Sequence, residues 1–225
     1  MPRGFFVTGT DTGVGKTLIA CALLRAFASA GKSTVGMKPV AAGAEEGRCP
    51  DVDALVAAST VRAPAKFVNP YAFDPAIAPH IAAELAGTRI EIDAIARACE
   101  ELSRRAEVVV VEGVGGFLVP LNERDTSADL ARRLALPVVL VVGMRLGCLN
   151  HALLTQAQIE ASGLRCAGWV ANCVVPPMPR LEENVRALTE RLGPALLGVV
   201  PFRPGATAEE VGQLLGIDAL IEATA

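Results

Sequence analysis

Short apolar runs alternate with longer segments of helical periodicity along this chain. The short runs are rich in β-branched residues and several are apolar throughout, which is typical of strands buried on both faces of a parallel sheet. This pattern predicts strands at residues 5–8, 34–37, 108–111, 138–142, 167–171 and 196–199. The longer segments predict helices at residues 16–30, 79–85, 92–105, 127–134, 152–162, 181–191 and 208–215.

Repeated strand–helix–strand units predict an α/β fold with a doubly wound, mainly parallel sheet and helices on both faces. A length of 225 residues suits one such domain, so we expect a single domain over residues 1–225. The stretch 41–79 is the least regular part and is rich in Pro, Gly and Ala. We expect it to flank the active site rather than to form a domain of its own.

Composition narrows the functional classes. Hydrophobic residues make up 52% of the chain and charged residues 20%, which is typical of a folded globular protein. The net charge of −3 gives no general attraction to nucleic acid or to an anionic membrane, so neither is expected as a partner. The longest strongly apolar run, residues 137–144, is far too short to span a membrane. The N-terminus has no signal-peptide pattern, and the six cysteines show no C-x-x-C pair and no regular paired spacing. We therefore expect a cytoplasmic protein with reduced thiols.

The clearest motif runs from Gly9 to Thr17, between a predicted strand and a predicted helix. Small residues let backbone N–H groups surround phosphate oxygens, and the helix N-terminus adds partial positive charge. Lys16 is placed to reach the β- and γ-phosphates, and the Thr17 hydroxyl is placed to bind Mg2+. The spacing departs from the usual P-loop pattern, because five residues separate Gly9 and Gly15. The order of strand, loop, Lys-Thr and helix still predicts a P-loop NTPase type of fold.

A second acid follows the apolar strand 108–111. Glu112 ends this run as a Walker-B-like residue, with glutamate in place of the more frequent aspartate, and glycines follow it. The carboxyl ends of parallel strands are where doubly wound sheets bind ligands. Hard Mg2+ prefers oxygen ligands, so Glu112 is expected beside the P-loop as a metal ligand.

With these blocks in view, the chain resembles the ATP-dependent dethiobiotin synthetase family over most of its length. The resemblance rests on segments that are ordinary alone and specific together: the stretch 6–17, Lys38-Pro39-Val40-Ala41, Asn69-Pro70-Tyr71 with Pro79-His80, Val111-Glu112-Gly113, Gly147-Cys148 with Asn150-His151-Ala152, and the stretch 168–172. It implies a homodimer that converts 7,8-diaminononanoate, CO2 and ATP into dethiobiotin, ADP and phosphate with Mg2+. It also implies a route through a carbamate and a carbamic-phosphoric anhydride, which needs positioned cations and no protein nucleophile.

The resemblance assigns roles to individual positions. The catalytic residues it implies are Lys16 and Lys38. The ATP-binding residues it implies are Gly13, Val14, Gly15, Lys16, Thr17, Leu18, Asp53, Glu112, Gly113, Val114, Gly115, Asn172, Pro201, Phe202 and Arg203. The metal ligands are Thr17, Asp53 and Glu112, with Asp51 left open as a rival to Asp53. The substrate residues are Thr12, Lys38, Ala42, Gly147, Cys148, Leu149 and Asn150, of which the stretch 147–151 is supplied across the dimer interface.

Three positions depart from the family pattern, and two other functions compete. Ala42 stands in place of a common serine, Gly13 in place of a frequent glutamate, and Arg145 in place of a frequent lysine. A partitioning-type ATPase switch shares the fold class, but many of these carry a lysine where this chain has Asp11. Another ligase of the same fold is the second alternative, although those enzymes are generally longer. Fold alone does not decide among them.

Overall fold

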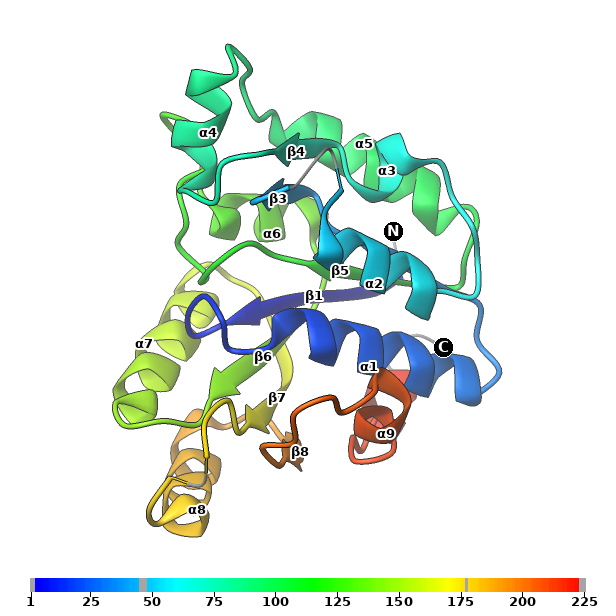
Figure 1. Cartoon of the computed structure of the whole chain (residues 1–225). Helices are drawn as coiled ribbons and strands as arrows, with labels where there is room; N and C mark the ends of the chain where they lie inside the picture. Colours follow the sequence, from blue (N-terminus) through cyan, green and yellow to red (C-terminus); the bar gives the residue numbers. More distant parts are fainter. Residues whose placement is uncertain (1–2, 45–47, 177, 223–225) are drawn as a thin grey trace.

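A six-stranded parallel sheet forms the centre of the molecule. The structure, a computed structural model, describes residues 3–44, 48–176 and 178–222. The strand order is β2-β5-β1-β6-β7-β8, and Figure 1 shows β1 in the middle of this sheet. The strands are β1 (Gly4–Gly9), β2 (Thr34–Met37), β5 (Val108–Glu112), β6 (Val138–Gly143), β7 (Cys166–Asn172) and β8 (Leu196–Val200). A separate pair, β3 (Val40–Ala42) and β4 (Tyr71–Phe73), is also parallel. The doubly wound parallel sheet predicted from the sequence is confirmed.

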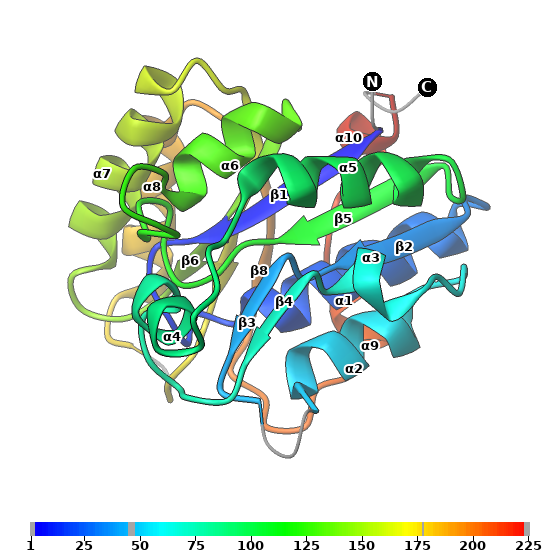
Figure 2. The ribbon, with the colours of Figure 1, turned by 90° about the horizontal axis from the view of Figure 1, so that it is seen from above.

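Helices cover both faces of the sheet. Figure 2 shows them in two groups with the strands between. One group is α1 (Lys16–Ser29), α2 (Pro50–Ala58) and α9 (Ala208–Gly212); α10 (Asp218–Glu222) lies beside the start of β1, and its Leu220 joins the core that contains α1. The other is α5 (Ile92–Ser103), α6 (Ser127–Leu134), α7 (Cys148–Ala161) and α8 (Leu181–Leu192). The short α3 (Ala65–Val68) contacts α5, and α4 (Pro79–Leu85) contacts β3 and β4.

Alternation along each strand feeds two separate cores. In β5, Val108 and Val110 join the core that contains α1, whereas Val109 and Val111 join the core beneath α5 and α6. Successive side chains of a strand point to opposite faces, so a strand covered on both sides must be apolar at every position. This requirement explains the uninterrupted valine run, and it leaves Glu112 as the first polar residue at the strand's carboxyl end.

Capping residues fix several helix starts. Thr126 and Asp129 form a capping box at the start of α6, and Thr207 and Glu210 form another at α9. Each box satisfies two backbone N–H groups that the first helical turn leaves without partners. The predicted starts of both helices, at Ser127 and Ala208, are confirmed.

Two parts of the fold differ from the prediction. The stretch 41–79, expected to be irregular, contains β3, α2, α3 and β4. Its elements bury few side chains, with Leu55 and Ala58 the only buried residues of α2, so their periodicity is weak. The helix predicted from residue 152 begins at Cys148 instead, because Gly147 adopts the left-handed φ of +93° that lets the chain turn directly into α7.

All six cysteines lie in the described part of the chain and are free thiols. Burial raises the pKa of Cys21 and of Cys99 to about 12 in each case, which keeps both thiols protonated and unreactive. In the described residues, no helix combines the length and the apolar character needed to cross a bilayer.

Candidate active site

The loop between β1 and α1 is shaped by two left-handed glycines. Gly13 has φ +74° and Gly15 has φ +88°, conformations that other residues adopt only at a cost. Gly15 also caps α1, and a Cβ atom there would lie 2.2 Å from the Asn172 side-chain nitrogen. Lys16 follows as the first residue of the helix, and its ammonium donates to the Asp11 carbonyl oxygen at 2.9 Å. The loop therefore closes around its own lysine, in the form a phosphate-binding loop requires.

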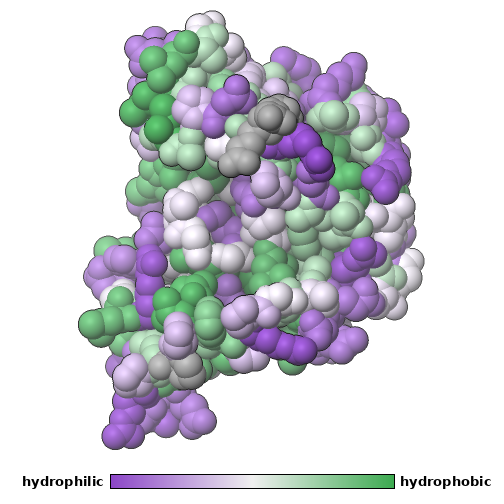
Figure 3. Space-filling model, viewed as in Figure 1, coloured by the Kyte–Doolittle hydropathy of each residue, from purple (hydrophilic) through white to green (hydrophobic). Residues whose placement is uncertain are grey.

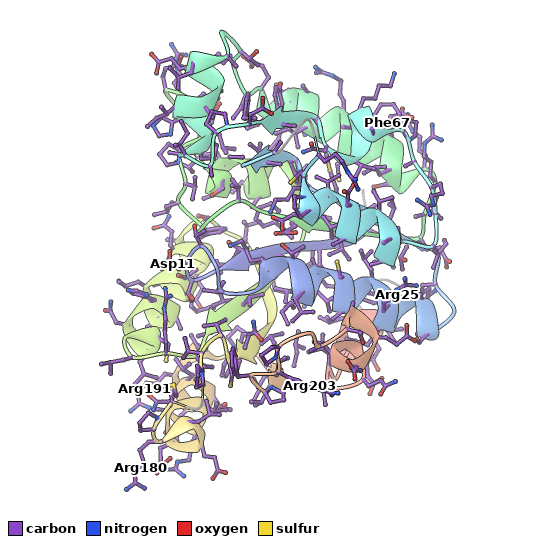
Figure 4. All side chains as sticks on the ribbon, in the orientation of Figure 1. Asp11, Arg25, Phe67, Arg180, Arg191 and Arg203 are labelled. Carbon is purple, nitrogen blue, oxygen red and sulfur yellow. The ribbon has the colours of Figure 1, made fainter. Side chains whose placement is uncertain are left out.

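Neighbouring strands hold this loop in place. The Asn172 amide, at the end of β7, donates to the Val14 carbonyl oxygen at 2.8 Å. The Thr10 backbone N–H donates to the carbonyl oxygen of Val141 in β6 at 3.0 Å. The Asp11 carboxylate forms an ion pair with Arg145 in the β6–α7 connection. Figure 4 shows Asp11 in the loop at the edge of the sheet where the strands end.

A buried lysine and two carboxylates lie beside the loop. The Lys38 ammonium, just beyond β2, donates to Glu112 Oε1 at 2.5 Å and lies 3.1 Å from Asp51 Oδ2 in the first turn of α2. The Thr17 hydroxyl donates to the same Glu112 Oε1 at 2.9 Å. The side chains of Lys38 and Glu112 are 5% and 1% exposed. The carboxyl ends of two strands, β2 and β5, and the starts of two helices, α1 and α2, thus converge on one polar cluster.

Burial and charge compete in this cluster. Burial by itself lowers the pKa of Lys38, but the Glu112 and Asp51 carboxylates raise it above its ordinary value, so the ammonium stays charged. For Glu112, burial raises the carboxyl pKa and the Lys38 charge opposes this. Burial and then the Lys38 charge lower the pKa of Lys16 to about 8. Lys16 is therefore the cation of the cluster whose charge is least stabilised by the protein.

The cluster fits a hard divalent cation. Among the described residues, no group of three or more His, Cys, Asp or Glu side chains is placed to hold a metal. Here the oxygen donors are Thr17, Glu112 and Asp51, and Glu112 Oε2 is buried without a hydrogen-bond partner. Mg2+ commonly takes one or two carboxylates and completes its shell with water and phosphate oxygens.

The geometry favours Asp51, the rival, over Asp53. Asp53 pairs with Arg48 at 2.9 Å and its side chain is 53% exposed, whereas Asp51 contacts Lys38. Residues two apart on a helix lie about 200° apart around its axis, so only one of the two can face the sheet edge. Asp51, and not Asp53, is therefore the acid that lies against Lys38 in this structure, while the expected role of Asp53 toward ATP and metal stays a prediction.

A cleft of about 690 Å³ opens over the loop and the polar cluster. In Figure 3 the middle of this face is hollowed between α4 and α7, and hydrophobic atoms gather on α4. The cleft is lined by Thr12, Gly13, Gly15, Lys16, Thr17, Lys38, Ala42, Asp51, Ala76, Ile77, Ala78, Pro79, Glu112, Val114, Gly115 and Val119. Ten residues predicted for the site lie in this set, from both its phosphate and its substrate groups.

Other predicted residues lie behind or beside the cleft. Val14 is fully buried under the loop, the Gly113 carbonyl lies 3.4 Å from the Lys38 ammonium, and Leu18 lines a smaller hollow between α1 and α2. Asn172 holds the loop by its amide nitrogen. The predicted stretch 201–203 follows β8, whose Val200 pairs with Asn172 across the sheet, so it starts beside this residue. Gly147, Cys148, Leu149 and Asn150 form the start of α7 and do not line the cleft.

Sequence reasoning named no residue of one wall of the cleft. Ala76, Ile77 and Ala78 line it, together with Val119 beyond β5. These side chains are apolar and carry no motif; Ala76, Ile77 and Ala78 lie in the stretch 41–79 that was expected to flank the site, but none of them was named as a site residue. An unmatched apolar wall facing a polar cluster suits a substrate with a hydrocarbon chain.

Comparison with solved structures defines the class of protein. The MinC:MinD cell division protein complex of Aquifex aeolicus superposes with a TM-score of 0.57 at 15% identity, covering 99% of this chain and 93% of that one. MinD of Pyrococcus horikoshii, in a structure with Mg-ADP, gives a TM-score of 0.55 at 14% identity over 100% and 95% of the chains. At these identities the likeness concerns the fold alone. Fold and loop together define a P-loop nucleotide-binding protein of the α/β class.

Sequence relatives define the family within that class. A family model described as an AAA domain matches residues 3–210. The ATP-dependent dethiobiotin synthetase of Nitrosospira multiformis is 54% identical over 96% of each chain. The enzyme of the same name from Aromatoleum aromaticum is 52% identical, covering 95% of this chain and 97% of its own. The chain belongs to the ATP-dependent dethiobiotin synthetase family.

Proposed function

We propose that this protein is a ligase of biotin biosynthesis that uses ATP to close a cyclic urea from 7,8-diaminononanoate and CO2. The observation that carries this is the near full-length identity of 50–54% to enzymes with that name, including one from Xanthomonas oryzae. The cleft supports it, because a phosphate loop, two lysines and an apolar wall face one another. The product is dethiobiotin, with ADP and phosphate.

The chemistry needs cations at two places. An amine of the substrate takes up CO2 as a carbamate and loses a proton. The carbamate oxygen then takes the γ-phosphoryl group, ADP leaves, and the second amine attacks the carbonyl carbon and expels phosphate. Lys16 and the loop N–H groups hold the nucleotide phosphates, and Lys38 neutralises the carbamate and the transferred group. Mg2+, when bound, would supply further neutralisation of the β- and γ-phosphate oxygens.

Thr17, Glu112 and Asp51 are the residues we propose for holding Mg2+, on the basis of their oxygen donors and the unpartnered Glu112 Oε2. Asn172 is proposed to read adenine. One N–H of its NH2 group donates to the Val14 carbonyl, and its Oδ1 is left to accept a hydrogen bond. This acceptor suits the 6-amino group of adenine. The stretch 201–203 is proposed to flank the same base.

The direct test is product formation. The purified protein is incubated with 7,8-diaminononanoate, bicarbonate, Mg2+ and ATP, and the cyclic urea is identified by mass spectrometry. Lys16→Ala should give no product, whereas Lys32→Ala, which alters a surface lysine paired with Glu107, should match the wild type. Absence of the urea with the wild-type protein, or an active Lys16→Ala variant, would reject the proposed function.

A homodimer with shared sites completes the proposal. The substrate residues 147–150 lie outside their own subunit's cleft, and Leu146 beside them is 98% exposed. At the start of α7, these residues would bind the carboxylate of the substrate held in the cleft of the partner subunit. Mixing Lys16→Ala with Asn150→Ala should restore about a quarter of the sites through hybrid dimers. No recovery after subunit exchange would contradict shared sites.

Six free cysteines fit a reducing compartment, and we expect the enzyme to work in the cytoplasm.

A further inference from the structure

Lys38 already contacts the atoms that a metal ion would need. Its ammonium is within 2.5 Å of Glu112 Oε1 and 3.1 Å of Asp51 Oδ2. Thr17, the third oxygen donor, is also bonded to Glu112 Oε1. The ammonium therefore lies among the same three side chains that form the proposed Mg2+ site.

Lys38 and Mg2+ cannot share this position. The two carboxylates supply two negative charges, which one ammonium half neutralises and one dication fully neutralises. With both cations in contact, an ammonium and a dication would repel each other in a site where Glu112 and Lys38 are almost fully buried and water screens little. The long lysine stem lets the ammonium move away from the acids, because Lys38 itself lines the cleft.

We propose that Lys38 and the divalent cation are alternative occupants of the Glu112–Asp51 pair, and that arrival of the metal displaces the Lys38 ammonium into the cleft. The inference rests on the proposed function and deepens it. Lys38 keeps the buried Glu112 and the half-exposed Asp51 neutralised and correctly spaced until the metal arrives. Its release then delivers the catalytic cation to the carbamate only after the metal is in place, which ties phosphoryl transfer to complete assembly of the site.

Metal affinity in the absence of nucleotide tests the competition directly. The probe is Mn2+, whose free ion is followed by electron paramagnetic resonance during titration of the folded protein. If the ammonium pairs with the two acids about nine-tenths of the time, only about one-tenth of the molecules have both acids free to bind a metal ion. Lys38→Met should then bind Mn2+ about tenfold more tightly or better. Lys38→Arg keeps the competing charge and should stay within about threefold of the wild type.

Lys16→Met is the matched control, since it removes the same charge from the same cleft while its ammonium contacts the Asp11 carbonyl and neither acid. It should tighten Mn2+ binding by no more than about threefold. An equal effect of both methionine variants would overturn the proposal, because a general loss of positive charge would then explain it. Lys38→Met binding no tighter than wild type would overturn it too.

Folding gives a second measurement if Lys38→Met leaves the acids too poorly neutralised to fold. Refolding is then compared with and without Mn2+. Recovery of the native circular dichroism only with Mn2+ supports alternative occupancy, and failure in both conditions contradicts it. None of these readouts uses the substrate, so they stand apart from the product assay, whose failure would reject the urea-forming activity alone.

Discussion

Lys16 carries its charge at a cost to folding. Its pKa is lowered to about 8 from an ordinary value of 10.5, first by burial and then by the Lys38 charge. Below pH 8 the side chain is charged in both the folded and the unfolded chain, so the free energy of unfolding is lowered by the full cost of burying this charge. Between pH 8 and 10.5 the folded protein has released the proton and the unfolded chain still holds it, so the free energy of unfolding rises with pH.

Replacing this lysine should therefore stabilise the protein without nucleotide. We expect Lys16→Met to raise the free energy of unfolding at pH 7 by up to about 3 kcal/mol, and the gain should shrink as the pH rises from 8 to 10.5. Urea unfolding of both proteins at a series of pH values measures this. A gain independent of pH would show that side-chain packing, and not the charge, is responsible.

Glu112 links the metal site to the core. Glu112→Gln keeps the shape but weakens a ligand for a hard cation, so the Mg2+ concentration for half-maximal activity should rise about tenfold or more. Removing one partner of the buried pair with Lys38 should also lower the free energy of unfolding by about 3 kcal/mol or more. Asp53→Asn, at the surface pair with Arg48, is the control and should leave both quantities near wild type. Equal Mg2+ effects of the two variants would return Asp53 to the site.

The two glycines of the turn from β1 into α1 should differ in how well they tolerate replacement. Gly13 and Gly15 both have left-handed φ values, but a Cβ at Gly13 meets nothing within 4 Å, whereas at Gly15 it would collide with Asn172. We expect Gly15→Ala to lower ATP affinity at least about tenfold more than Gly13→Ala. Both substitutions share the backbone cost of about 1 kcal/mol, but only Gly15→Ala displaces the Asn172 side chain, whose amide holds the Val14 carbonyl of the loop. Calorimetric titration with ATP separates them. Equal losses of ATP affinity would mean that the hydrogen bond from Asn172 to Val14 has no part in shaping the loop.

Elements with strong local signals were predicted closely, and the others failed for identifiable reasons. The valine run of β5 and the capping box at Thr126 leave little choice of structure. The three-residue strands β3 and β4 exist because they pair with each other across an intervening segment that contains α2 and α3, and no local pattern reveals this pairing. Asp53 was preferred to its rival Asp51 from the family resemblance, and which of the two side chains faces Lys38 depends on where α2 begins and how it packs, which the resemblance does not contain. The tie from Asn172 to Val14 spans 158 residues and is visible only in three dimensions.

Whole-molecule stability depends heavily on the core beneath α1. Phe27 is fully buried and stacks on Phe5 of β1, with ring centroids 5.6 Å apart. We expect Phe27→Ala to lower the free energy of unfolding by about 3–5 kcal/mol, a large share of the 5–15 kcal/mol usual for a domain. Phe202→Ala changes a half-exposed ring and should cost less than about 1 kcal/mol. Urea denaturation of both variants without nucleotide checks the contrast, and similar losses would contradict the assigned core.

The central position of the first strand has a consequence for synthesis. β1 leaves the ribosome before either neighbour, since β5 and β6 follow about a hundred residues later and Asn172 later still. At roughly 5–20 residues per second, the phosphate loop waits on the order of 10 s for the residue that clamps it. During that time the apolar β1 segment and the largely apolar α1 are exposed on a nascent chain whose pairing strands have not yet been made. Chaperone binding during translation should therefore be concentrated on the first thirty or so residues, and a stalled chain ending before Asn172 should bind no ATP.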